Sequence, residues 1–310
     1  MHGLAPMVPN PASAGTVAQR VAPAAPPNLP RYRFAPSPVR TVFVIGPPRS
    51  GTTLLSFLLA GGPNVLSLSE PFRLHRVFPR FGIRWLLREL RRKHDLQGTP
   101  PAWHANDRVL LEHLRGAARS NGMSTLIIKE TFRSELAWAN LGLLQQFVDG
   151  GDPVIGIIRH PYDCAVSTLR MFRLWRGVVG ELVQFLVPDL PLFRGDEDIA
   201  ENVARTWNDF ATWCETRELL LVKYEDLARD PRATLAGVCT KAGLAFDPCM
   251  LDHRHPRGPF GGIGDPGVMT RPARPVSTKS IGRRRRLPIA LQEILSSVCA
   301  PSAARFGYAL

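Results

Sequence analysis

A short glycine-bounded loop carries the densest set of anion-binding groups in the chain. It spans residues 46–51 (GPPRSG) and holds Arg49 and Ser50, and the hydroxyls of Thr52 and Thr53 follow it directly. An apolar run at helical spacing begins at the same point, so the positive end of a helix dipole is expected there. A guanidinium, hydroxyls and backbone N–H groups at one place form a cradle for an oxyanion.

The loop has the G-x4-G frame of a Walker A motif with one difference. The lysine that follows the second glycine in that motif is Thr52 here, and the cation stands inside the loop as Arg49. An ATP-using enzyme would lack the lysine that holds the β- and γ-phosphates. The residues therefore favour another phosphate-like ligand, with a P-loop kinase acting on a small molecule as the alternative enzyme.

Three further charged residues stand where predicted strands end. Glu70, Lys129 and Arg159 each follow directly, or within two residues, an apolar run of the kind that forms buried strands. The carboxyl ends of the strands form the edge of an open α/β sheet at which ligands bind. We therefore expect a carboxylate and two cations at the same edge as the loop.

Apolar runs alternate along the chain with segments of helical periodicity. Strands are predicted near 41–46, 64–68, 125–128, 154–158 and 218–224, and helices near 52–60, 136–148, 161–175, 198–216 and 288–298. Apolar runs without polar alternation are typical of strands buried on both faces. The pattern predicts an α/β fold in a single domain, a P-loop-like, mainly parallel sheet with helices on both faces.

The first 38 residues differ in composition from the rest. They contain many prolines among alanines and serines, with too little apolar surface to fold alone. The sequence therefore predicts a disordered Pro/Ala-rich arm over 1–38 and a folded domain over 39–310.

The chain is strongly basic, with 39 Lys and Arg against 26 Asp and Glu and a formal net charge of +13. This charge favours anionic ligands or surfaces. No zinc-finger spacing or RNP-type motif is visible, so nucleic acid is not expected as a partner. The odd number of cysteines and the lack of a CxxC pair indicate neither a disulfide framework nor a metal site. Without a signal peptide or an apolar run of membrane-spanning length, we expect a cytoplasmic protein.

Arginine is concentrated between residues 72 and 94. The spacing predicts an amphipathic helix with a solvated charged face. Its apolar stripe consists of Trp85, Leu86, Leu87 and Leu90, and the flanking basic residues are Arg84, Arg88, Arg91, Arg92 and Lys93. Contact of these arginines with an anionic acceptor or with a lipid surface is the alternative interpretation.

Several motifs resemble those of sulfotransferases that use 3′-phosphoadenosine 5′-phosphosulfate (PAPS). The run PRSGTTLL at residues 48–55 is similar to their 5′-phosphosulfate loop, above all in the tyrosylprotein and carbohydrate branches and their soluble bacterial relatives. The resemblance implies that five loop residues bind the donor, namely Arg49, Ser50, Gly51, Thr52 and Thr53.

Two later segments extend this resemblance. RHPYDCAVS, from Arg159 to Ser167, is similar to the family's 3′-phosphate motif, and LLVKYEDL resembles a strand whose tyrosine, Tyr224 here, lies against the adenine. The stretch 277–286 (STKSIGRRRR) is similar to a glycine-and-basic lid over the donor. It implies donor-binding roles for three residues, Ser277, Gly282 and Arg283, and Arg284 stands where the family has a tryptophan.

The resemblance also implies catalytic roles. Glu70 corresponds to the glutamate that acts as base, 21 residues after the loop arginine, and it precedes a proline as in the carbohydrate branch. Lys129 and Arg49 would neutralise charge on the oxygen that leaves sulfur. The histidine base of the cytosolic phenol and steroid sulfotransferases has no counterpart, because Thr131 occupies its position. No metal is implied.

The sequence thus predicts transfer of a sulfuryl group from PAPS to a hydroxyl of an acceptor, which is a sugar, a glycolipid, a natural product or a tyrosine. The expected acceptor-binding insertions lie near 72–110, 173–198 and 246–276. The alternatives are the P-loop kinase and a non-catalytic binder of polyanions or membrane surfaces. A preference for a 3′-phosphorylated adenine nucleotide distinguishes the first interpretation from the other two.

Overall fold

The computed structural model describes residues 37–78, 81–97, 106–133, 144–145, 147–148, 152–178, 195–217, 219–252, 258–264 and 276–310, with backbone alone for 174–178. The predicted N-terminal arm lies outside these ranges apart from its last two residues. Much of the predicted insertions lies outside them as well. Of the helix predicted near 136–148, only 144–145 and 147–148 are described, and they are helical.

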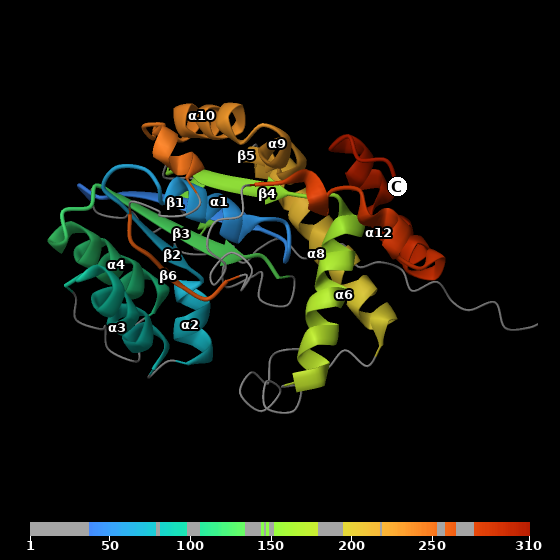
Figure 1. Cartoon of the computed structure of the whole chain (residues 1–310), viewed down its shortest axis with the longest axis horizontal. Coiled ribbons are helices and arrows are strands. Elements are labelled where there is room, and N and C mark those ends of the chain that lie inside the picture. Colours follow the sequence, from blue (N-terminus) through green and yellow to red (C-terminus); the bar gives the residue numbers. More distant parts are fainter. Residues whose placement is uncertain are drawn as a thin grey trace, which may run out of the picture. The chain divides into compact units, whose positions relative to one another are not determined.

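A six-stranded sheet forms the centre of the described chain, and every neighbouring pair of strands is parallel (Figure 1). Across the sheet the order is β5 (Leu220–Lys223), β4 (Val154–Ile158), β1 (Arg40–Gly46), β3 (Thr125–Thr131), β2 (Val65–Ser69) and β6 (Phe260–Gly262). The chain passes from β1 to one side of the sheet and later returns to the other side at β4. The gap between the ends of β1 and β4 is therefore the topological switch point, where open α/β sheets bind ligands.

Alternate residues of the strands belong to two separate hydrophobic clusters, one on each face of the sheet. In β1, Val42 and Val44 pack with helices α1 (Thr52–Leu59), α9 (Tyr224–Arg229) and α10 (Pro231–Ala242). Phe43 and Ile45 belong to the other cluster. Its helices are α2 (Pro71–Val77), α3 (Gly82–His94), α4 (Asp107–Ser120), α6 (Pro161–Val178), α8 (Asp196–Arg217) and α12 (Ile289–Arg305). The predicted α/β sheet with helices on both faces is confirmed.

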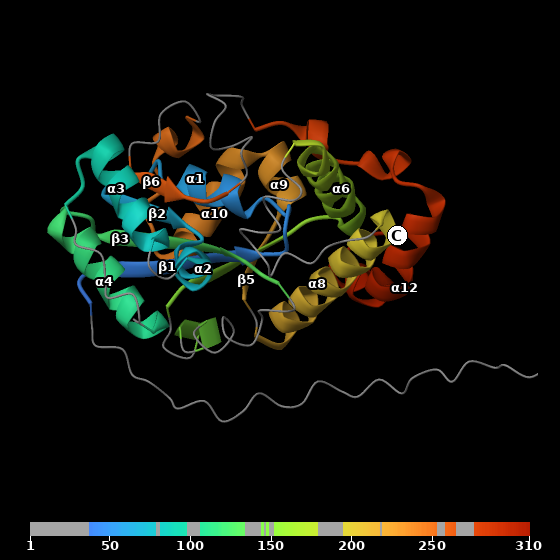
Figure 2. The ribbon, with the colours of Figure 1, turned by 90° about the horizontal axis from the view of Figure 1, so that it is seen from below.

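The second cluster has helices at both ends of the sheet. Figures 1 and 2 show α6, α8 and α12 grouped together, and α2, α3 and α4 grouped near β2 and β6. Three 3₁₀ turns complete the described elements, η1 (Pro248–Leu251), η2 (Thr278–Ser280) and η3 (Arg283–Arg286). Within the described ranges, no helix combines the length and the apolar character needed to cross a membrane.

Some element boundaries differ from those expected. The strand predicted to end before Lys129 continues to Thr131, because β2 pairs with it as far as Lys129 and β1 as far as Thr131. Tyr224 begins α9 instead of ending β5. The last helix continues through Pro301 to Arg305. The three-residue β6 was not predicted, since two of its residues are glycines.

Candidate active site

The loop between β1 and α1 is held in a conformation that depends on its glycines. Gly51 has φ 102°, and a Cβ on it would lie 2.5 Å from Cδ2 of Tyr224. A Cβ on Gly46 would lie 2.3 Å from the carbonyl oxygen of Ile157. Arg49 also adopts a positive φ of 67°. The backbone therefore packs closely against β4 and α9, and no larger residue fits at either glycine.

Hydrogen bonds inside the loop fix its shape. The backbone N–H and the hydroxyl of Ser50 both donate to the carbonyl of Pro47, at 3.2 and 2.8 Å. Thr52 begins α1, and Gly51 before it supplies no side-chain cap. Thr52 and Thr53 are both buried at the helix start. The positive end of α1 is thus directed toward the mouth of the loop, as the sequence predicted.

The loop meets the β4–α6 junction at the switch point. Nε of Arg49 donates to the Ser167 hydroxyl at 3.0 Å, and Nη1 of Arg159 donates to the Arg49 carbonyl at 3.1 Å. The Arg159 guanidinium lies over the Tyr224 ring, 4.4 Å from its centroid. Its Nε is buried and has no hydrogen-bond partner among the described residues. The loop and the β4–α6 junction therefore form one cationic site, although Arg49 and Ser167 are 118 positions apart in the sequence.

The segment 277–286 contacts this site through Ser280, and Asp163 at the start of α6 anchors it. The Asp163 carboxylate accepts hydrogen bonds from the backbone N–H groups of Gly282 and Arg283, at 2.9 and 2.7 Å. The Ser280 carbonyl accepts a hydrogen bond from Nη2 of Arg159, and the Ser280 hydroxyl is hydrogen-bonded to the Tyr224 hydroxyl. Gly282 and Arg283 are thus held at the start of α6, and their donor-binding roles stay predictions.

Ser277 is the one predicted donor residue that the structure does not bring to this group. It is exposed at the start of η2, and its side chain makes no capping hydrogen bond. Ser280, one turn later, makes the contacts with Arg159 and Tyr224 instead. A donor role for Ser277 stays a prediction.

Glu225, in the first turn of α9, holds the start of α6 in place. Its carboxylate accepts hydrogen bonds from the backbone N–H of His160 at 2.9 Å and from the hydroxyl of Tyr308 at 2.8 Å. These bonds fix the start of α6 and thereby the orientation of Arg159.

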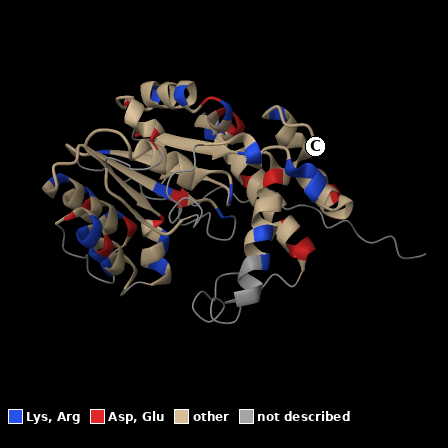
Figure 3. Cartoon of the chain, in the orientation of Figure 1, with Lys and Arg blue, Asp and Glu red and all other residues tan. Residues whose placement is uncertain are grey.

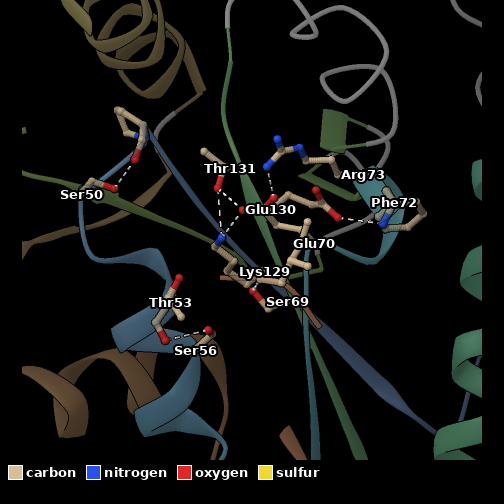
Figure 4. Close-up of polar contacts among 12 residues, drawn as sticks. Ser50, Thr53, Ser56, Ser69, Glu70, Phe72, Arg73, Lys129, Glu130 and Thr131 are labelled. Carbon is tan, nitrogen blue, oxygen red and sulfur yellow. Dashed lines mark hydrogen bonds and ion pairs between the residues drawn. The ribbon is translucent and has the colours of Figure 1, made fainter. Parts of the chain in front are cut away.

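A buried ionic cluster lies at the ends of β2 and β3 (Figure 4). Oε1 of Glu70 is 2.5 Å from Nζ of Lys129 and accepts the Thr131 hydroxyl at 2.6 Å. Oε2 pairs with Nη1 of Arg73 at 2.6 Å, one turn into α2. Lys129 also donates to the Thr131 hydroxyl at 3.0 Å. The two residues predicted to act as base and cation are therefore in direct contact.

Charge determines the ionisation of Glu70. Burial acts to raise the pKa of its carboxyl, but the positive charges of Lys129, Arg73 and Arg133 outweigh burial and hold the pKa far below its usual range. Glu70 is therefore a carboxylate in the folded protein at neutral pH. It also has an unusual backbone φ of 56°, which directs its side chain across the end of β3.

The neighbouring carboxyl of Glu130 responds in the opposite way. Burial, and then the negative charge of Glu70, raise its pKa to about 8. Glu130 accepts a hydrogen bond from the Phe72 N–H at 2.9 Å, at the start of α2. It lies on the other face of β3 from Lys129 and Thr131, because successive side chains of a strand alternate.

Four contributors to the site were not predicted from the sequence, namely Arg73, Thr131, Asp163 and Ser280. Arg73 has a local signal, since it follows Glu70 by three residues in a segment that begins with proline and so lies on the same helix face. Asp163 and Ser280 have no such signal, because each acts on a residue more than a hundred positions away or on the backbone.

Fold and site together define an α/β protein of the P-loop-like class with two cationic junctions and a buried Glu–Lys pair at one sheet edge. The sequence model described as "Sulfotransferase family" matches residues 41–248, which is most of the chain. The chain therefore belongs to the sulfotransferase family, and transfer of a sulfuryl group is the general class of its reaction. No curated protein matches the chain in sequence.

Solved structures agree with this fold. The sulfotransferase domain from the Synechococcus PCC 7002 olefin synthase superposes with a TM-score of 0.57 at 23% identity, covering 90% of this chain and 98% of that domain. The sulfotransferase domain from the curacin biosynthetic pathway gives a TM-score of 0.56 at 17% identity, covering 88% of this chain and 99% of the domain.

Proposed function

We propose that the protein transfers a sulfuryl group from PAPS to a hydroxyl of an acceptor. The observation that carries this proposal is the contact between the two cationic junctions, Arg49 to Ser167 and Arg159 to the Arg49 carbonyl. A ligand with one anionic group at the loop and a second at the β4–α6 junction matches this arrangement. PAPS has a phosphosulfate on one side of its ribose and a 3′-phosphate on the other.

The residues present fit such a donor. The loop offers Arg49, the Thr52 and Thr53 hydroxyls and the N-terminus of α1 to the phosphosulfate. The buried Arg159 Nε, which lacks a partner among the described residues, and the Ser167 hydroxyl are suited to the 3′-phosphate. The Tyr224 ring lies beside Gly51 and under the Arg159 guanidinium, and this position supports a role for Tyr224 in contacting the adenine. The backbone at Gly282 and Arg283 would cover the donor.

In the proposed reaction the acceptor oxygen forms a bond to sulfur while the bond from sulfur to the phosphate oxygen breaks. Glu70 accepts the proton of the acceptor hydroxyl. General-base catalysis of this kind raises the rate by roughly 10²- to 10⁴-fold. Lys129 and Arg49 oppose the negative charge that develops on the phosphate oxygen and so act mainly on the transition state. The acceptor is proposed as a hydroxyl compound, namely a sugar, glycolipid, natural product or tyrosine.

The resting contact between Glu70 and Lys129 is compatible with these roles. Lys129 keeps Glu70 ionised, which a base requires, and its ammonium has three donors, of which Glu70 and Thr131 take two. A donor phosphate near the third would compete for the ammonium and leave Glu70 a stronger base. This coupling would link activation of the acceptor to occupancy of the donor site.

Thermal unfolding with nucleotides tests the proposal. We expect 3′-phosphoadenosine 5′-phosphate to raise the unfolding temperature more than AMP or ATP at equal concentration. The Ser167→Ala variant should lose most of the difference between the bisphosphate and AMP while keeping its own unfolding temperature. Equal stabilisation by AMP would contradict the 3′-phosphate assignment, and a larger effect of ATP with magnesium would indicate kinase chemistry.

A further inference from the structure

Helix α3 has an apolar face inside the protein and an unusual face outside it. Ile83, Leu86 and Leu90 are buried in the core. On the opposite side, Phe81 is 72% exposed and Trp85 is 44% exposed. Of the large hydrophobic side chains in the described ranges, only four are exposed, and these two stand one helical turn apart.

Arginines alternate with the two aromatic residues on that side. With about 100° of rotation per residue, positions 81, 84, 85, 88 and 92 fall within an arc of roughly 100°. These positions hold Phe81, Arg84, Trp85, Arg88 and Arg92, and all five are exposed. We call this set the α3 outer face.

The α3 outer face is strongly cationic. Along its whole length α3 has five arginine and lysine residues and only one acidic residue, Glu89 (Figure 3). Glu89 pairs with Arg92 at 3.0 Å and with Lys93 at 3.2 Å. Arg84 and Arg88 form no ion pair with the residues that the structure describes. Their charges are therefore directed to solvent.

We propose that the α3 outer face docks on a lipid bilayer that contains anionic lipids. Aromatic side chains favour the headgroup region of a bilayer, where their apolar rings leave water. Arginines beside them bind lipid phosphates and carry charge opposite to that of the surface. Since Leu86 and Leu90 are occupied in the core, the helix inserts only the Phe81 and Trp85 rings. The contact is shallow, reversible and sensitive to salt.

The aromatic pair decides between a bilayer and a soluble polyanion. A sulfated or phosphorylated polymer gains affinity from Arg84, Arg88 and Arg92 through counterion release. It gains little from a phenylalanine that is 72% exposed. A bilayer uses both kinds of side chain. This inference concerns a surface outside the candidate active site and does not depend on the donor or acceptor.

Co-sedimentation with vesicles tests the proposal on the full chain. We expect binding to phosphatidylcholine vesicles that contain about 30 mol% phosphatidylserine, little binding to phosphatidylcholine alone, and loss of binding near 0.5 M salt. Each arginine near an anionic membrane contributes roughly a fivefold factor in affinity, so Arg84→Gln/Arg88→Gln/Arg92→Gln should weaken binding on the order of 100-fold. Phe81→Ser/Trp85→Ser should abolish stable binding while salt-sensitive residual attraction remains.

Matched variants separate this surface from the general positive charge of the protein. Arg205→Gln/Arg217→Gln/Lys241→Gln removes the same charge from exposed sites on α8 and α10, and Ile289→Ser removes a residue that is 74% exposed on α12. Both should bind vesicles nearly as the wild type does. Equal losses in the two triple variants, or unchanged binding after Phe81→Ser/Trp85→Ser, would overturn the proposal. So would binding to heparin without binding to vesicles, which would assign the face to a soluble polyanion.

Discussion

The Lys129 ammonium and the Glu70 carboxylate lie 2.5 Å apart, with both side chains almost completely buried (Figure 4). The proposed base and the proposed transition-state cation thus form one ion pair before any substrate binds. Neither residue can be altered without changing the electrostatics of the other.

Replacement of Glu70 by glutamine tests its role as base. Gln keeps an oxygen that can accept from Lys129 and Thr131 but cannot take a proton. We expect the single-turnover rate to fall by about 10²-fold or more, while calorimetric binding of 3′-phosphoadenosine 5′-phosphate stays close to that of the wild type. Glu293→Gln, at an exposed position on α12, is the control. Turnover like that of the wild type would remove Glu70 from the role of base.

Thr131 is expected to position the carboxylate of Glu70. Its hydroxyl donates to Glu70 and accepts from Lys129, and valine has the same shape without these bonds. Thr131→Val should lower kcat by roughly tenfold, as expected for the loss of one hydrogen bond to a charged group, with little change in KM for the donor. Thr131→Ser should restore kcat, and this rescue would not follow from a merely structural role.

The control for Thr131→Val is Thr240→Val on α10, where the hydroxyl donates to the Ala236 carbonyl. It should leave kcat unchanged. If serine at position 131 were as inactive as valine, the hydroxyl would not be what positions Glu70.

Glu130 should make the stability of the protein depend on pH. Its carboxyl has a pKa of about 8 in the folded protein against an ordinary value of 4.5. The folded state therefore holds a proton that the unfolded state has released, and this contribution to stability is lost as pH rises from about 4.5 to about 8. Glu70, with its lowered pKa, acts in the opposite sense and loses its contribution only in acid.

Glu130→Gln removes the ionisation but keeps an acceptor for the Phe72 N–H. The variant should match the wild type in unfolding temperature near pH 5 and exceed it increasingly toward about pH 9. Thermal unfolding at several pH values measures the difference. Parallel curves for the two proteins would show that Glu130 is not protonated in the folded state.

Much of the fold and the cationic loop was predictable because both depend on local sequence. Runs such as 41–46 and 154–158 have no polar alternation, and the glycines of residues 46–51 permit only a tight turn. The sequence predicted only that Arg49 and Ser167 lie near the same edge of the sheet. Their hydrogen bond depends on the rotamer of a loop arginine with φ 67°.

What could not be predicted depends on register and on tertiary contact. Lys129 reaches Glu70 because β3 continues past it, with Ser69 paired to Lys129 across the sheet. The β6 strand forms although glycine disfavours strands. It approaches β2 so closely that only glycine fits, because a Cβ at Gly262 would lie 2.0 Å from the Ser69 carbonyl oxygen. Ser280, and not Ser277, contacts Arg159 and Tyr224 because η2 turns the chain between the two serines. Propensity carries no information on any of these three contacts.

Gly51 offers a sharp test of the loop itself, because alanine there meets two obstacles. The backbone has φ 102°, and the added Cβ would lie 2.5 Å from the Tyr224 ring. Gly51→Ala should destabilise the protein by about 1–3 kcal/mol and weaken binding of 3′-phosphoadenosine 5′-phosphate by roughly tenfold or more, since Tyr224 and Arg159 must shift together.

Gly116→Ala is the matched control for this substitution. Gly116 lies within α4, and a Cβ added there would have open space around it, with no atom within 4 Å. The variant should raise stability by roughly 0.5–1 kcal/mol and leave nucleotide binding unchanged, because alanine favours the helix and touches nothing at the site. Similar nucleotide affinity in the two variants would mean that the loop conformation at Gly51 does not determine the donor site.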